Sequence, residues 1–414
     1  MKRLQLTKII TLFLIAASIL TFAGCSVKIQ AIDLMENIEP EHVEGKEPDD
    51  RFIYSAADFS VELFKKSYDK SRSSLVSPLS VMIALAMAAN GTDNESLSQI
   101  ESIIGGDIKL NELNKYLYSY INALPDSDKA HFNIANSLWI KDSYAEDINK
   151  DFLQYNKNYY NASVYKTPFN KQTVKDINSW VKRETDGAIK DTLKSIGHDE
   201  ILYIINAITF EAEWSNPYKK DNIKKEVFVN IDNKEKTAEM MHSNEYSYIE
   251  NEDCIGFIKP YAGNTYSFAA LLPNEGIQIE KFIDSLTGNI FIDILRNSDA
   301  TAVDAAMPKF SYDYNINLES QLIDMGIKDI FSIERADLSK TFTERSFVSD
   351  IIHKTYIQVD GKGTKAGAVT NSIVDAGAMP PREIKNVKLD RPFVYAIIDN
   401  ATKLPIFIGA VLDV

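Results

Sequence analysis

Cysteine is scarce in this chain of 414 residues, which contains only Cys25 and Cys254. Two cysteines cannot form a disulfide framework or a cysteine-based metal site. Because Cys25 ends a segment with the pattern of an export signal, Cys254 is alone in the remaining chain. With no histidine close to it, we expect Cys254 to be a partly buried, passive thiol and not a nucleophile.

Histidine and clustered basic residues are also lacking. The five histidines (His42, His131, His198, His242 and His353) are scattered and show no metal-ligand spacing, so we predict no metal site. Lysine and arginine number 45 against 59 acidic residues, which gives a net charge of -14. Binding to nucleic acid needs clustered Lys and Arg against the phosphates, and the sequence has no such cluster. Nucleic acid is therefore excluded as the expected partner.

The common signatures of enzymes are missing as well. The chain has no G-x-S-x-G, no H-E-x-x-H and no phosphate-binding loop. The segment from Gly361 to Ala366 does fit the dinucleotide-binding pattern G-x-G-x-x-A. That pattern requires a following helix, another parallel strand and an acid about 20 residues later, but Pro380 and Pro381 intervene and little chain remains. We therefore predict neither catalysis nor a cofactor.

The N-terminus has the features of a secretory signal. Lys2, Arg3 and Lys8 precede an apolar run over residues 9–23, and the run ends in the sequence FAGC. This ending resembles a bacterial lipobox, which implies a signal peptide over residues 1–24 and a lipid on Cys25. Phe22 stands where leucine is usual, so an uncleaved membrane anchor is the alternative. Either way we expect an extracytoplasmic protein held at the cell membrane, with the N-terminal lipid as its sole membrane contact.

Residues 25–50 are rich in Asp and Glu and show little apolar periodicity. Such a segment buries too little surface to offset its ordering entropy, so we predict a solvated acidic tether. The folded domain is then expected over residues 51–414. Hydrophobic residues make up 45% of the chain, enough to fill the core of one large domain.

Within this domain, helical patterns dominate the first half and strand patterns the second. In the sequence SPLSVMIALAMAANG, Ser77 is expected to be the N-cap, Pro78 the first helical residue and Gly91 the end of the helix. Residues 81–89 are apolar on all sides, which predicts a fully buried helix. Residues 202–214 form a nearly continuous apolar run around Asn206, typical of a central strand buried on both faces. The pattern favours a single α+β domain.

The segment from Lys354 to Pro381 is the most unusual stretch. It begins as a strand and then loses its large side chains while keeping a period of two. Taking every second residue from Thr364 gives only small, uncharged side chains: Thr364, Ala366, Ala368, Thr370, Ser372, Val374 and Ala376. Because successive strand residues point to opposite faces, this loop could enter a crowded sheet with its small residues inward.

Several blocks of the chain resemble the serpin family, in the order in which serpins carry them. The blocks are SPLSVMIALAMAANG, NSLW, INSWVKRETDGAIKDTL, INAITFEAEW, MPKFSYDYNINLESQLIDMGIKDIF, VSDIIHKTYIQVDGKGTKAGAVT and DRPFVYAIIDNATKLPIFIGAVL. The resemblance runs from about Phe52 to Val414. It implies a helical cap, three mainly antiparallel or mixed β-sheets and an exposed reactive loop.

The resemblance also implies a function. A serpin offers its loop to a serine protease, forms an acyl-enzyme and inserts the cut loop into its largest sheet before hydrolysis is complete. The expected partner is thus a target serine protease, elastase-like or subtilisin-like because small residues flank the cut, and the inhibitor is expected to be a monomer. A non-inhibitory serpin-fold binding or scaffold protein is the alternative.

The resemblance assigns roles to residues of this chain. The reactive bond falls near Gly377–Ala378, and the hinge comprises Gly363, Thr364, Ala366, Gly367, Ala368 and Thr370. A polar cluster where the sheet opens comprises Ser77, Ser80, Asn206 and His353. Trp214, Lys309 and Gly361 lie where the loop enters. Because an acidic residue usually stands at position 361 and pairs with the lysine, we expect a less firmly held entry point in this chain.

Overall fold

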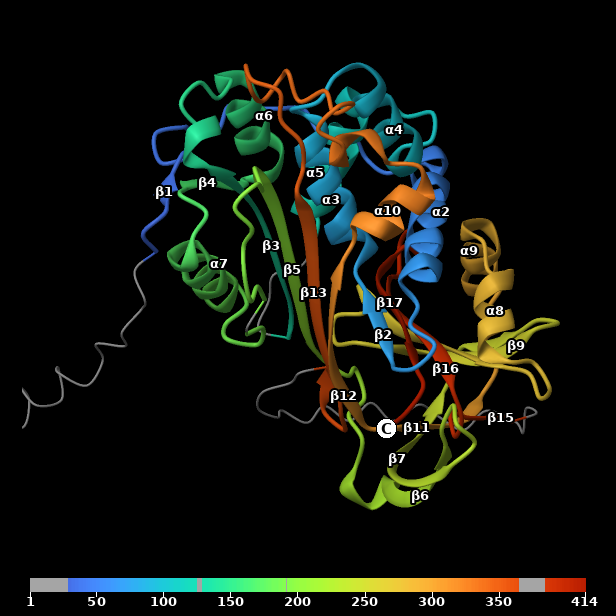
Figure 1. The fold of residues 1–414 in the computed structure, drawn as a ribbon. Helices are drawn as coiled ribbons and strands as arrows, with labels where there is room; N and C mark the ends of the chain where they lie inside the picture. The colour runs from blue at the N-terminus through green and yellow to red at the C-terminus, as the bar shows by residue number, and fades with distance from the viewer. Residues whose placement is uncertain (1–28, 125–128, 191, 365–383) are drawn as a thin grey trace, which may run out of the picture.

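The computed structural model of the chain describes residues 29–124, 129–190, 192–364 and 384–414. Within these residues the strands form three sheets, helices α2 to α6 gather at one end of the largest sheet, and α7 lies against its face (Figure 1). This arrangement confirms the predicted α+β class. The helices are α2 (Asp50–Ser67), α3 (Pro78–Ala89), α4 (Asn94–Ile104), α5 (Leu110–Asn122), α6 (Lys150–Tyr160), α7 (Lys171–Glu184), α8 (Ile279–Ser285), α9 (Gly288–Arg296) and α10 (Glu319–Met325).

The largest sheet has the strand order β1-β4-β3-β5-β14-β13-β12. Its strands are β1 (Ile32–Asp33), β4 (Ser163–Thr167), β3 (Ala130–Lys141), β5 (Leu202–Glu213), β14 (Gly363–Thr364), β13 (Asp350–Val359) and β12 (Phe310–Asn317). β5 is the apolar run predicted to be a central strand, and nearly all of its residues are buried. Below the short β14, β5 and β13 pair with each other in parallel.

The two smaller sheets complete the body. One has the order β2-β17-β16-β10-β9-β8 and the other β15-β11-β7-β6. The first contains β2 (Ser74–Val76), β17 (Pro405–Val411), β16 (Phe393–Asp399), β10 (Tyr266–Pro273), β9 (Cys254–Pro260) and β8 (Tyr248–Glu250). The second contains β15 (Lys385–Lys388), β11 (Val303–Pro308), β7 (Glu235–Glu245) and β6 (Ile223–Val229).

Helices cover both faces of the largest sheet (Figure 1). On one face α3 packs against β3 and β5, and every residue of α3 is buried, as its apolar sequence predicts. On the other face α7 places Trp180 edge-on against Trp139 of β3, with ring centroids 6.4 Å apart. The sheet is therefore buried from both sides, which explains the continuous apolar sequence of β5.

Residues 29–49 of the predicted solvated tether stay mostly exposed, but they are attached to the domain instead of extending freely from it. β1 pairs with β4, the backbone N–H of Ala31 donates to the buried Asp176 carboxylate at 2.9 Å, and Met35 is 5% exposed. The segment contains a few apolar residues among its acids, and these pack against the core, while β1 pairs with the outer edge of β4. Strand pairing and burial of these residues offset the entropy cost of ordering the segment, and neither contact can be predicted from its composition alone.

No helix of the described residues is long and apolar enough to cross a membrane. The predicted signal peptide and lipidation site at Cys25 lie outside the described residues.

Candidate functional site

The polar residues predicted to cluster are brought together at the line where β5 and β13 meet. We call this line the seam; it comprises the paired residues from Asp350 with Tyr203 to Thr355 with Ile208. Asn206 and His353 are direct partners across the seam, and their side chains share a hydrogen bond between Asn206 Oδ1 and His353 Nδ1. The seam is therefore joined by a side-chain bond in addition to its backbone ladder.

The remaining contacts of this cluster come from α3 and β3. The backbone N–H of Ser77 donates to His353 Nε2 at 3.0 Å, and Asn206 Nδ2 donates to the Ser80 carbonyl oxygen at 2.8 Å and to Asn136 Oδ1. Ser77 is at the N-cap position of α3, but its hydroxyl makes no cap bond and has no partner among the described residues. Asn136 was not predicted. The only feature of the sequence that could have indicated Asn136 is that it is a polar residue within a strand pattern.

His353 is held as the neutral imidazole. It is 0% exposed, and burial lowers its pKa from 6.5 to about 3. Because Nε2 accepts a bond from Ser77, Nδ1 carries the proton and donates to Asn206. The charged form would lose the acceptor role of Nε2 as well as its hydration, so protonation opposes the closed seam.

We expect the free energy of unfolding to fall as the pH drops from about 6.5 towards 3, by up to about 1.4 kcal/mol per pH unit from His353 alone. The sign follows because the folded pKa lies below the unfolded value, so the unfolded chain binds the extra proton. Asp350, whose pKa is raised to about 7 mainly by burial, has the opposite sign. Urea unfolding of the unmodified chain and of His353→Gln from pH 7 to 4.5 isolates the His353 contribution. Equal slopes for the two proteins would contradict it.

Two of the predicted hinge residues, Gly363 and Thr364, form β14 at the head of the seam. Thr364 pairs with Ala212 of β5 and with Val359 of β13, and it is 1% exposed. Its hydroxyl is 2.6 Å from the Tyr261 hydroxyl. A Cβ atom on Gly363 would lie 2.0 Å from the Ala212 carbonyl oxygen, so this position requires glycine. The chain thus enters the sheet with the small inward residue that the alternation predicts.

The turn before β14, which we call the entry turn, comprises residues 360–362. Asp360 Oδ1 accepts from the backbone N–H of Lys362 at 2.8 Å, and Asp360 N–H donates to the Gly363 carbonyl oxygen at 2.9 Å. Trp214 Nε1 donates to the Asp360 carbonyl oxygen at 2.8 Å. Trp214 N–H donates to the Lys362 carbonyl oxygen at 2.9 Å. The G-x-G pattern at residues 361–363 therefore belongs to the turn that reverses the chain direction between β13 and β14.

Lys309 forms its ion pair with Glu239 of β7, with 3.3 Å between the charged atoms. Gly361 offers no acid, as predicted, but its carbonyl oxygen accepts from Tyr218 N–H at 2.8 Å. The expectation of a less firmly held entry point depended on the missing acid alone. Backbone bonds from Trp214 and Tyr218 attach the turn instead. Sequence reasoning missed Tyr218, Asp360 and Tyr261, since nothing local marks their contact with the loop.

The other predicted loop residues, Ala366, Gly367, Ala368, Thr370, Gly377 and Ala378, lie outside the described residues. Their roles stay predictions.

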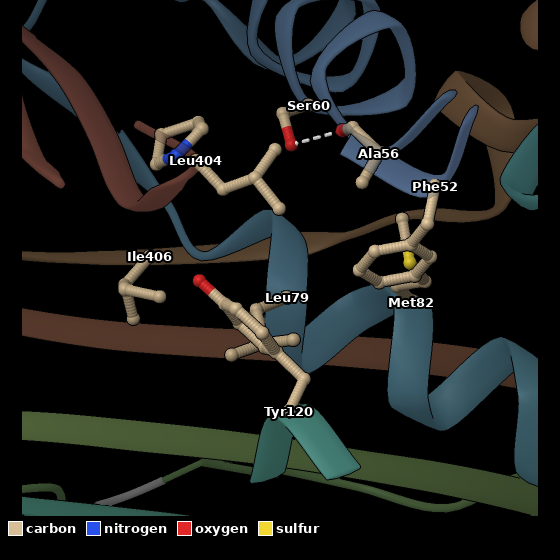
Figure 2. Close-up of a pocket in the computed structure, with 9 residues that line it drawn as sticks. Phe52, Ala56, Ser60, Leu79, Met82, Tyr120, Leu404 and Ile406 are labelled. Atoms are coloured by element: carbon tan, nitrogen blue, oxygen red, sulfur yellow. Dashed lines mark hydrogen bonds between the residues drawn. The ribbon is translucent and has the colours of Figure 1, made fainter. Parts of the chain in front are cut away.

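Three other candidates, a metal site, a cavity and Cys254, offer no second functional site among the described residues. Among the described residues no group of three or more His, Cys, Asp or Glu side chains could hold a metal ion. A space between α2, α3 and β17, shown in Figure 2 with Phe52, Met82 and Tyr120 around it, is a cavity of about 10 Å³. That volume suits one water at most. Cys254 is fully buried, not partly as predicted, and burial raises its pKa to about 12, which opposes reactivity.

Comparisons with known proteins agree with this geometry. The family described as "Serpin (serine protease inhibitor)" matches residues 54–414. The crystal structure of the thermophilic serpin tengpin in its native state is similar at 46% identity with a TM-score of 0.88, over 93% of this chain and 100% of that chain. Tengpin in its latent state gives a TM-score of 0.80 at 44% identity, over 89% of this chain and 100% of that chain. The leukocyte elastase inhibitor of Equus caballus is 28% identical over 370 residues, covering 85% of this chain and 96% of the relative.

Proposed function

The chain belongs to the serpin family, and from this membership we propose that it inhibits a serine protease by acylation of its reactive loop followed by insertion of that loop into the largest sheet. The observation that carries the proposal is the position of β14. Gly363 and Thr364 already pair with β5 and with β13 at the head of the seam. A strand that continues from Thr364 along the same direction would separate β5 from β13.

The seam is suited to such opening. Below β14 it consists of six parallel residue pairs, from Asp350 with Tyr203 to Thr355 with Ile208. A continuing strand would replace each parallel pair with two antiparallel ladders, since β14 pairs antiparallel with both neighbours. Antiparallel pairing is slightly more stable per residue. A loop that has been cut is no longer held at its C-terminal end, so its attachment there no longer opposes insertion. The bond between Asn206 and His353 must break on the way, so the polar cluster controls how readily the seam opens.

The loop chemistry indicates the class of protease. The residues predicted to flank the cut, Gly377 and Ala378, are small. A protease with a deep charged or aromatic specificity pocket gains little from such residues, whereas an elastase-like or subtilisin-like pocket accepts them. We propose serine proteases of these two kinds as targets. The protein itself supplies no catalytic group in this scheme, because the nucleophile belongs to the protease.

Incubation with an elastase-like and with a subtilisin-like protease tests the proposal. We expect a band on a denaturing gel whose mass is the sum of the protease and the inhibitor without its C-terminal fragment, together with loss of protease activity. The covalent acyl bond survives denaturation, whereas a reversible complex does not. A protease whose active-site serine is replaced by alanine is the control, and it should give no such band.

Rapid cleavage of the loop with full protease activity remaining would overturn the inhibitory proposal. That outcome would favour the alternative, a serpin-fold protein that acts by binding or as a scaffold.

We further propose that Cys25 carries a lipid and that the domain works outside the cytoplasm at the cell membrane. The support is the sequence FAGC after an apolar run with a basic start.

A further inference from the structure

A buried ion pair lies beneath the entry turn. Lys259 of β9 and Glu245 of β7 are 2.6 Å apart between charged atoms, and their side chains are 1% and 7% exposed. The Ser243 hydroxyl donates a further bond to the same Glu245 oxygen at 2.6 Å. Burial lowers the pKa of Lys259 while Glu245 opposes this change. Buried pairs of this kind are often no more stable than apolar residues of similar size, so stability alone does not account for it.

The ammonium group of Lys259 also faces two aromatic rings. Its Nζ lies 4.5 Å from the centroid of the Tyr218 ring and 5.4 Å from that of Trp214. The Tyr261 ring stacks on Trp214 with centroids 4.5 Å apart and an interplanar angle of 8°. A cation within about 6 Å of a ring face is attracted to it, and the attraction is stronger where water is excluded. Lys259 therefore contacts both rings from within the core.

These rings belong to the residues that bond the entry turn and the hinge. Trp214 bonds the carbonyl oxygens of Asp360 and Lys362, and Tyr218 bonds that of Gly361. Tyr261, stacked on Trp214, contacts the Thr364 hydroxyl. A continuous set of contacts thus runs from the buried cation to the inserted residue.

We propose that Lys259, oriented by Glu245, is a positioning residue that keeps Gly363 and Thr364 docked in the sheet through Trp214 and Tyr218. The docking of Gly363 and Thr364 in the sheet does not depend on the proposed inhibitory function. Only its consequence for protease trapping rests on the proposed function. With Gly363 and Thr364 docked between β5 and β13, insertion has already begun, so releasing these two residues should speed acylation and, at the same time, let more acyl-enzyme be hydrolysed.

Thiol labelling measures docking directly. In the mature chain carrying Thr364→Cys, the introduced thiol is protected while residue 364 is docked in the sheet. Its labelling rate therefore follows the fraction of molecules in which this residue has been released. The chain without this substitution gives the background from Cys254 and from any Cys25 thiol that carries no lipid. Cys254 contributes little, because it is fully buried and its pKa is raised to about 12.

The decisive variant in this background is Lys259→Met with Glu245→Gln, which removes the cation without leaving a buried charge. We expect the labelling rate to rise about tenfold, since two desolvated cation–ring contacts are lost. The melting transition should stay cooperative. An unchanged labelling rate in the folded double variant would overturn the proposal.

Tyr218 provides a second test should the double variant fail to fold. Tyr218→Leu removes one ring that faces the cation, and Tyr218→Phe keeps it while losing the hydroxyl. We expect faster labelling in Tyr218→Leu and the original rate in Tyr218→Phe. Equal rates in the two variants would contradict the role of the cation–ring contact. Because labelling needs no protease, failure here is distinct from absence of a covalent protease complex.

Discussion

We expect Thr364→Arg to be cleaved by the target protease without trapping it. Thr364 is 1% exposed and sits between Ala212 and Val359 with its hydroxyl against Tyr261. An arginine there would bury a charge with no acid beside it in the described contacts, at a cost of several kcal/mol. Insertion would slow relative to hydrolysis, and the trapped fraction should fall by about a hundredfold.

The measurement is the ratio of covalent complex to cleaved inhibitor on a denaturing gel, with residual protease activity as the second readout. Lys362→Arg is the matched control, because it places an arginine two positions earlier at an exposed site of the entry turn. Thr364→Ser should also trap normally, since it keeps the hydroxyl and adds no bulk. Trapping that survives Thr364→Arg would show that Thr364 does not lie on the inserting face.

The second large effect concerns stability. Cleavage of the loop near Gly377–Ala378 should raise the melting temperature by about 10 °C or more. The inserted segment would add on the order of ten backbone hydrogen bonds at about 1 kcal/mol each. In a chain of this length about 1 kcal/mol shifts the transition by roughly 1 °C.

Differential scanning calorimetry before and after limited proteolysis gives this shift. The cleaved Thr364→Arg variant serves as the control, because it undergoes the same cut but resists insertion. An equal melting temperature for intact and cleaved protein would contradict insertion along the seam. A rise that Thr364→Arg shows equally would assign the gain in stability to something other than strand insertion.

Much of the site follows from local sequence. The period-two alternation after Val359 predicts which side chains enter the sheet, and Thr364 does enter it. The apolar run around Asn206 predicts a central strand that must give its one polar side chain a partner. Resemblance to serpins added His353, Ser77 and Ser80 as those partners, and the structure places them in contact with Asn206 or with each other.

Other features depend on contacts between distant segments. The acidic residues of 29–49 predict solvation, yet the edge of β4 and the buried Asp176 hold part of this segment on the domain. The composition of a segment indicates how much apolar surface that segment can bury. It does not indicate which strand edge or buried acceptor a distant segment provides for it.

The amino-acid sequence by itself determined the small-residue face of the loop, the buried α3 and the absence of an acid at Gly361, because each depends on residue type and spacing along one element. Only the tertiary structure decided how the entry turn is held. Lys259 reads in sequence as one lysine in a strand, and Glu245 as one acid before a turn. A buried charge is stable only where its partner lies within a few ångströms, and the packing of β7 against β9 brings the two together beneath Trp214 and Tyr218.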